Sequence, residues 1–346
     1  MIRTNLLLFT LLSICLCACT QKGNQAESIS QEASYPVAEW DKATAILMHT
    51  PGQELFDGVI HPSAGLFENY FDVDKAADEH RGYISALEKN GIKVFTVEQI
   101  LNETPIEKLR EYAKNSLTFD ISNIPDANTE ENDNYRIKVL GEMSRADLIR
   151  CILLQPTVAL YPTDHNTGVE AVYTHRPLMN LYFTRDQSLT TPRGHIICQM
   201  NSTQRTLATS IIALCYEQLA VKPNLEISCE GRKEGDPEWV TVDLYTRPAG
   251  EKEYHLTQQD LSFVQYLKDN GFSIIPIKEE DELHYANNYL TIAPRHIMAV
   301  AGQSEELQQD FKRHGVKVEW IPLESLIDGY GAAHCMTQVL SRIAVK

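Results

Sequence analysis

One unit recurs along the chain and constrains its fold more than any other feature. An amphipathic helical stretch ends at a glycine and passes directly into an apolar, strand-like run in residues 83–98, 263–278 and 307–322. Each glycine falls where a helix needs a left-handed residue after its last turn. Because such units cannot bury their apolar faces alone, their repetition predicts an α/β fold whose units are stacked or arranged in a circle.

Further segments fit the same plan. Apolar strands are expected before the helices, and a hairpin followed by a helix is expected in the middle of the chain. The expected strands are residues 43–49, 240–246 and 289–300, the last broken at Ala293-Pro294; the hairpin joins 181–189 to 195–200 around Pro192-Arg193-Gly194, and its helix is 204–219.

The repeated helix–strand pattern is interrupted between residues 100 and 156. Residues 106–117 and 142–154 are helix-like, and the polar stretch 123–134 separates them. We interpret residues 101–156, approximately, as a helical insertion.

Charge and composition exclude several classes of protein. The chain has 346 residues, a formal net charge of −16 and 43% hydrophobic residues. This is ordinary globular composition, with enough length for one large domain or two smaller ones. An acidic surface of this kind lacks the basic footprint of a protein that binds nucleic acid or an anionic membrane face.

Cysteine usage indicates neither a metal site nor a disulfide framework. Three of the eight cysteines crowd the N-terminus, and the other five are widely spaced without a CxxC pair. Those five are Cys151, Cys198, Cys215, Cys229 and Cys335. An odd number leaves at least one thiol free. Because the spacing supports neither a zinc site nor a disulfide framework, we expect no metal, and we expect no other cofactor.

The N-terminus has the pattern of an export signal. Arg3 is followed by an apolar run too short to span a bilayer, and Leu16-Cys17-Ala18 precedes Cys19. This resembles a bacterial lipoprotein signal, which implies a signal peptide in 1–18 and lipidation of Cys19. Residues 19–34 then form a flexible tether and 35–346 the folded body, on the periplasmic or outer-membrane face of a cell envelope. A plain secretory signal and a retained anchor are the alternatives.

Two motifs carry the candidate chemistry. One is Asn180-Leu-Tyr-Phe-Thr-Arg-Asp186, and the other runs from Gly329 through His334 and Cys335 to Leu340. Glycine and alanine around a lone cysteine leave room for a planar substrate to approach a thiolate. On spacing alone, however, Cys335 could be a buried small residue, and Asp186 could form a surface ion pair with Arg185.

The order of these motifs resembles that of arginine deiminase and its amidinotransferase relatives, the pentein superfamily. The matching stretches cover nearly all of the mature chain except about 228–253. They are Glu39-Trp40-Asp41, 48–52, Glu79-His80, 180–186, Arg205, 288–294 and 329–335. The resemblance implies a five-bladed α/β propeller with a helical insertion.

The resemblance also implies roles for single residues. Cys335 corresponds to the nucleophile that forms a covalent amidino-thioether, and Asp186 to a carboxylate that holds the guanidinium. Asn180 and Arg205 correspond to the residues that receive the substrate carboxylate, and Gly329 to the one that receives its amino group. The implied partner is a small guanidino substrate, with no nucleic acid, and the membrane is met only through the lipid anchor.

Two family segments have no counterpart. The family carries Leu-Glu-Gly-Gly-Asp, which supplies a second carboxylate, and His-x-Asp, which supplies the acid and base. None of the 11 histidines here is followed two residues later by Asp, and Glu234-Gly235-Asp236 is only a fragment of the first motif. The sequence therefore predicts a propeller with fewer than five blades.

Other histidines are poor substitutes on sequence grounds. His334 adjoins Cys335, but neighbouring side chains on an extended backbone point in opposite directions. His255 and His284 have charged neighbours, which favours a solvent-facing position.

Three functions follow as hypotheses. The first is hydrolysis of a guanidino compound, L-arginine to L-citrulline and ammonia, through a covalent Cys335 intermediate. The second is a catalytically inactive lipoprotein that binds a guanidino or amino-acid ligand. The third is an amidinotransferase, because hydrolases and transferases share the covalent intermediate.

The lipidation hypothesis predicts the location of a variant. Cys19→Ala removes the acceptor of the lipid, so the variant should move from the membrane fraction to the soluble fraction on centrifugation of cell lysates. Unchanged retention in the membrane fraction would contradict it.

Overall fold

The computed structural model describes residues 38–165, 167–191, 194–200, 202, 204–221, 223–226 and 258–344. No helix within these ranges is long and apolar enough to cross a membrane. The signal, the tether, the expected strand 240–246, His255 and Glu234-Gly235-Asp236 lie outside the described residues. The elements in chain order are β1 (Lys42–Met48), α1 (Gln53–Val59), α2 (Pro62–Gly65), α3 (Val73–Lys89), β2 (Lys93–Thr96), α4 (Val97–Glu103), α5 (Ile106–Ser116), β3 (Thr118–Asp120), α6 (Thr129–Glu142), α7 (Arg145–Leu154), β4 (Pro156–Pro162), β5 (Val169–His175), β6 (Ser188–Thr191), β7 (Gly194–Ile197), α8 (Thr206–Gln218), β8 (Pro223–Glu226), α9 (Gln258–Asp269), α10 (Glu279–Glu282), β9 (Leu290–Ala293), β10 (His296–Val300), α11 (Glu305–Arg313), β11 (Lys317–Ile321), the 3₁₀ helix η1 (Leu326–Gly329) and β12 (Gln338–Ile343).

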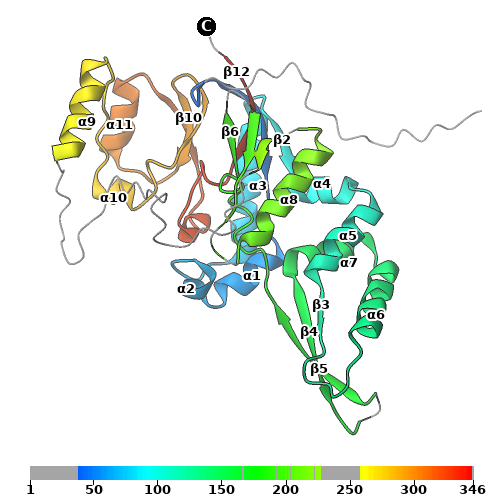
Figure 1. The fold of residues 1–346 in the computed structure, drawn as a ribbon. Helices are drawn as coiled ribbons and strands as arrows, with labels where there is room; N and C mark the ends of the chain where they lie inside the picture. Colours follow the sequence, from blue (N-terminus) through cyan, green and yellow to red (C-terminus); the bar gives the residue numbers. More distant parts are fainter. Residues whose placement is uncertain are drawn as a thin grey trace, which may run out of the picture.

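In each of the four described sheets, the central strand pairs antiparallel with one neighbour and parallel with the other. The parallel strand precedes the central strand in β3-β4-β5. In the orders β12-β1-β2, β6-β7-β8 and β11-β10-β9 it follows the central strand and is reached through a helix, which is α3, α8 or α11 (Figure 1). The α/β class and the repeated strand–helix–strand unit are therefore confirmed. The propeller with fewer than five blades stays a prediction.

The glycines of the repeats end their helices as expected. Gly91, Gly271 and Gly315 have φ angles of 75°, 80° and 69°, which lie in the left-handed region. The strand expected after Gly271 was wrong, because residues 272–278 form no strand. A strand needs a hydrogen-bonded neighbour, and no described strand pairs with this run. Its Ile275 and Ile277 are instead packed against the small core cluster around α11.

Two other expectations need correction. The strand expected over residues 181–189 is largely a series of turns, such as Phe183 N–H to the Asn180 carbonyl at 3.2 Å, and only Ser188–Thr191 forms a strand. The polar stretch 123–134 is helical from Thr129, because Asn128 caps α6 by accepting from two backbone N–H groups. Helices α5 and α7 agree with the helical stretches expected there, and β4 and β5 extend away from the body (Figure 1).

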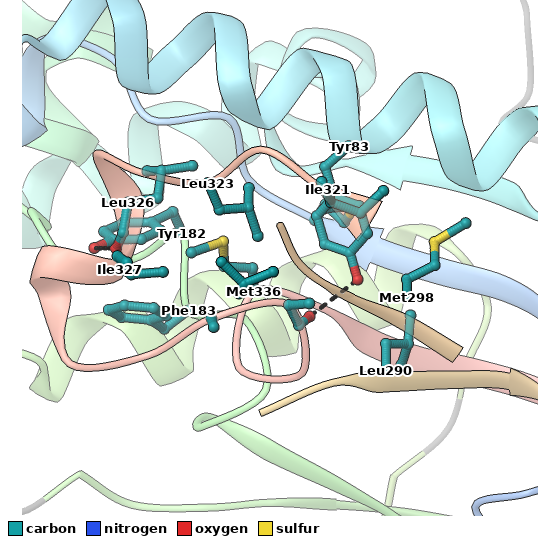
Figure 2. Packing of buried hydrophobic residues seen from close by; sticks show 14 of the residues in the cluster. Tyr83, Tyr182, Phe183, Leu290, Met298, Ile321, Leu323, Leu326, Ile327 and Met336 are labelled. Carbon is teal, nitrogen blue, oxygen red and sulfur yellow. Dashed lines mark hydrogen bonds between the residues drawn. The ribbon is translucent and has the colours of Figure 1, made fainter. Parts of the chain in front are cut away.

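One of the two large apolar clusters includes residues of the Gly329–Cys335 segment. It joins β1, α3, β9 and β10 to the aromatic rings of Tyr182 and Phe183 and to Met336 (Figure 2). The fully buried Tyr83 of α3 donates its hydroxyl hydrogen bond to the Ala333 carbonyl at 3.1 Å. The cysteine-bearing segment is thus held on a packed core.

A buried group of charges follows β1. His49, 1% exposed, has Nε2 3.0 Å from Glu54 Oε1 and Nδ1 2.6 Å from Glu98 Oε1. Burial alone would lower the pKa of His49, but the two carboxylates raise it to about 10. The neighbouring His80 is also buried, and burial lowers its pKa to about 3 although Glu98 acts to raise it. No local sequence pattern indicates that these residues meet.

This group predicts how stability varies with pH. The folded pKa of His49 is raised above the unfolded value of about 6.5, so its stabilisation is complete below that pH and is lost as the pH rises toward 10. The lowered pKa of Glu54 makes its contribution disappear as the pH falls below about 4.5. Urea unfolding should show a loss of stability between about pH 7 and pH 9.

The variant His49→Gln serves as the comparison. It cannot titrate, so the difference between its free energy of unfolding and that of the wild type should shrink over the same pH range. An equal pH slope in both proteins would exclude His49 as the source.

Candidate active site

Cys335 lies in a turn between η1 and β12, and several bonds fix that turn. Met336 N–H donates to the Ala332 carbonyl at 3.1 Å, and Arg185 N–H donates to the Cys335 carbonyl at 3.2 Å. Thr184 Oγ1 donates to the carbonyls of both Leu47 and Met336, at 3.0 and 3.2 Å. The two motifs found in the sequence are therefore joined directly through Thr184 and Arg185.

The glycines of the second motif make room for the aromatic residues of the first. A Cβ on Gly329 would lie 1.9 Å from Tyr182 Oη, and one on Gly331 would lie 2.6 Å from Phe183 Cε1. The Tyr182 and Phe183 rings contact each other with centroids 4.0 Å apart. Gly329 is therefore placed for close packing of the backbone against Tyr182.

Asn288, just before β9, holds the cysteine turn from the other side. Its Nδ2 donates to Cys335 Sγ at 3.0 Å, and its Oδ1 accepts from the backbone N–H groups of His334 and Cys335 at 3.1 and 3.2 Å. One side chain thus positions both the thiol and the backbone that carries it.

His334 lies beside the thiol, contrary to the expectation from its position. The two neighbours are in a turn and not in an extended strand, so their side chains can meet, and each acts on the pKa of the other. His334 Nε2 also lies 3.4 and 3.3 Å from the two oxygens of Glu39. Arg185 Nη1 is 2.9 Å from Glu39 Oε1, so the expected Arg185–Asp186 pair is replaced by an Arg185–Glu39 pair.

Asp186 holds a guanidinium in this structure. Arg205, at the start of α8, places Nη2 2.7 Å from Asp186 Oδ2. The buried Asn180 donates from Nδ2 to the Gly65 carbonyl at 3.3 Å, while its Oδ1 is buried without a hydrogen-bond partner. The structure therefore brings Asp186 and Arg205 together and places Asn180 against α2.

Asp186, Arg205, Asn288 and Cys335 lie within segments that match known proteins. A sequence model of the arginine deiminase family matches residues 64–235 and 232–342. The chain belongs to the arginine deiminase family. An arginine deiminase from Halobacterium salinarum is 28% identical over 200 residues, which are 53% of this chain and 40% of that protein.

The chain therefore spans two fifths of the length of that curated relative. Solved structures similar to this chain include a dimethylarginine dimethylaminohydrolase. It is 16% identical, and the match covers 85% of this chain and 98% of the other with a TM-score of 0.45. Another is an amidinotransferase from Microseira wollei, 12% identical, covering 90% and 98% with a TM-score of 0.42.

The environment of the arginine deiminase-like cysteine favours its ionised form. Burial acts to raise the pKa of Cys335, but the hydrogen bonds from His334 and Asn288 bring it below the usual value. Burial likewise opposes the charged form of His334, yet its bonds to Cys335 and Glu39 raise its pKa. The His334 hydrogen bond, aided by Arg185, lowers the pKa of Glu39 to about 2.

Two residues of this site, Glu39 and Asn288, had no role assigned to them from the sequence. Glu39 and Asn288 occur in stretches that match the family order, but their distance along the chain from Cys335 gives no local signal. His284, considered as a base, contacts the Ala301 carbonyl through Nε2 at 3.1 Å. Within the described ranges no group of His, Cys, Asp and Glu has an arrangement that could hold a metal ion.

The glycine packing predicts the effect of a single methyl group. Gly331→Ala would force the new Cβ against Phe183 and to 3.1 Å from Cys335 Cβ, so we expect a loss of about 1–3 kcal/mol in the free energy of unfolding. Urea unfolding of the variant and the wild type measures this difference in the free energy of unfolding.

Gly82→Ala on α3 is the matched control. Its Cβ would meet nothing within 4 Å, and alanine favours a helix over glycine by about 0.5–1 kcal/mol. Equal effects of the two substitutions would contradict the proposed packing.

Proposed function

We propose that the protein hydrolyses a guanidino compound, with L-arginine giving L-citrulline and ammonia, through a covalent intermediate on Cys335. One observation carries the proposal. A thiol whose pKa is lowered lies in the same site as a carboxylate, Asp186, that already binds a guanidinium. Membership of the arginine deiminase family supports the choice of substrate class.

The chemistry requires both groups. A guanidinium carbon is a poor electrophile, so a thiolate must attack it while a carboxylate holds the cation. The new S–C bond forms, the C–N bond to one terminal nitrogen breaks, and ammonia leaves with the proton taken from the thiol. Water then adds to the thiouronium carbon and the S–C bond breaks, which returns the thiol and releases the neutral ureido product with one proton.

The remaining residues would orient the substrate. We place its carboxylate at Arg205 and Asn180, whose Nδ2 carries a second hydrogen besides the one donated to the Gly65 carbonyl, and its amino group at the Gly329 backbone. The tight packing of Gly329 on Tyr182 supports a position where the backbone itself faces the ligand.

The architecture and the location belong to the same proposal. We propose that the sheets β12-β1-β2, β6-β7-β8 and β11-β10-β9 are blades of an incomplete propeller, which their common topology supports. Residues 101–156 would then be an insertion. Residues 1–19 would attach the protein to the cell envelope through a lipid on Cys19.

Release of ammonia and citrulline from L-arginine tests the reaction. The purified full-length protein should produce both in equal amounts, and Cys335→Ala should abolish production because no covalent intermediate can form. Cys151→Ser is the control, because this buried thiol lies on α7, where it contacts Met143 Sδ at 3.8 Å.

Other outcomes separate the alternatives. A folded wild type that binds L-arginine without turnover would favour the inactive binding protein. Transfer of the amidino group to an added amine, in place of citrulline formation, would favour the amidinotransferase.

A further inference from the structure

The proposed reaction needs a group that accepts the thiol proton and returns it to the leaving ammonia, and the chain lacks the His-x-Asp segment that the family resemblance assigns to this task. Resting on the proposed function, we propose that His334 is the acid and base for Cys335, with Glu39 as the residue that positions its ring.

The contacts of His334 join the reacting sulfur to a carboxylate. His334 is the neighbour of Cys335 in one turn, and its Nε2 lies within 3.4 Å of both Glu39 oxygens. Asn288 accepts from both backbone N–H groups of the pair, so the turn that aligns the two side chains is itself fixed. A carboxylate beside an imidazole orients the ring and stabilises its protonated form.

Other histidines in the described ranges are engaged elsewhere. Their rings contact groups other than Cys335, as the following pairs show: His49 with Glu54 and Glu98, His61 with Ala64, His80 with Thr50, His165 with Thr163, His175 with Asp57, His195 with Thr190, His284 with Ala301, His296 with Glu319, and His314 with Asp310. His334 is about one third exposed, so its ring can face both the thiol and a bound substrate.

Charged groups from several elements face this pair. Glu39, before β1, favours the imidazolium, and Arg185 opposes it while binding the same carboxylate. Asp186 disfavours the thiolate, whereas Asn288 hydrogen-bonds it. Arg342 of β12 also acts on Glu39. Loss of Glu39 would therefore leave Arg185 to oppose the imidazolium without compensation.

The proton can be followed through both half-reactions. It moves from Cys335 Sγ to His334, the thiolate forms the S–C bond, and His334 gives the proton to the terminal nitrogen as the C–N bond breaks and ammonia leaves. The neutral ring then takes a proton from the attacking water, and that proton returns to the sulfur when the S–C bond breaks.

Alkylation of Cys335 by iodoacetamide tests the assignment without any substrate. In the full-length protein, the alkylation rate at Cys335, followed by peptide mass spectrometry from about pH 5 to pH 10, should rise at a pH below the usual thiol value of about 8.5. In His334→Gln the rise should move up to that value, and the rate at neutral pH should fall about tenfold. Glu39→Gln should move the pH of this rise upward by a smaller amount, and Glu39→Asp should restore the wild-type pH profile.

A second histidine–glutamate pair provides the control. His296→Gln breaks the 2.8 Å contact with Glu319 and should leave the Cys335 profile unchanged. Circular dichroism establishes that each variant is folded. A wild-type profile in His334→Gln would overturn the proposal, as would an equal shift in His296→Gln.

The two proposals fail in different ways. L-arginine turnover in His334→Gln should fall about 10²- to 10⁴-fold, and turnover at the wild-type rate would overturn the role of His334 alone. An alkylation profile that depends on His334 in a protein that never turns over L-arginine would support thiol activation and overturn the proposed function alone.

Discussion

The antiparallel pairing of β1 with β12 is the constraint on which the site depends. It joins the first and last strands of the described chain in one sheet, from Lys42 beside Ile343 to Leu47 beside Gln338. The buried Arg342 strengthens this junction by donating to the carbonyls of Asp41 and Thr291, each at 2.7 Å. Since Glu39 precedes β1 and Cys335 precedes β12, residues nearly three hundred positions apart can act on one thiol.

The repeated units could be predicted because their signals are local. Helix periodicity, a left-handed glycine and an apolar run lie within sixteen residues, so the sequence alone locates α3 with β2 and α11 with β11. The strand after Gly271 could not be judged in the same way, because a strand forms only beside a partner and that partner is a matter of tertiary structure.

The site was accessible to sequence reasoning only in part. Asp186 and Arg205 could be named from motif order, but their mutual ion pair could not, because it depends on how the turn before β6 meets the start of α8. His334 was expected to point away from Cys335, because neighbouring side chains diverge on an extended backbone. The local conformation is instead a turn. The ion pairs of His49 with Glu54 and Glu98 likewise join residues with no shared local pattern.

Under the proposed function, ligand binding at the Asp186–Arg205 pair is an exchange of partners. A ligand that carries both a guanidinium and a carboxylate would replace each half of the pair, so that neither partly buried charge is left alone. A simple amine offers only one of the two charges and would leave Arg205 uncompensated. Under the proposed reaction the ureido product has lost its positive charge, so Arg205 regains Asp186 and the protein's own side chain competes with the product for the site.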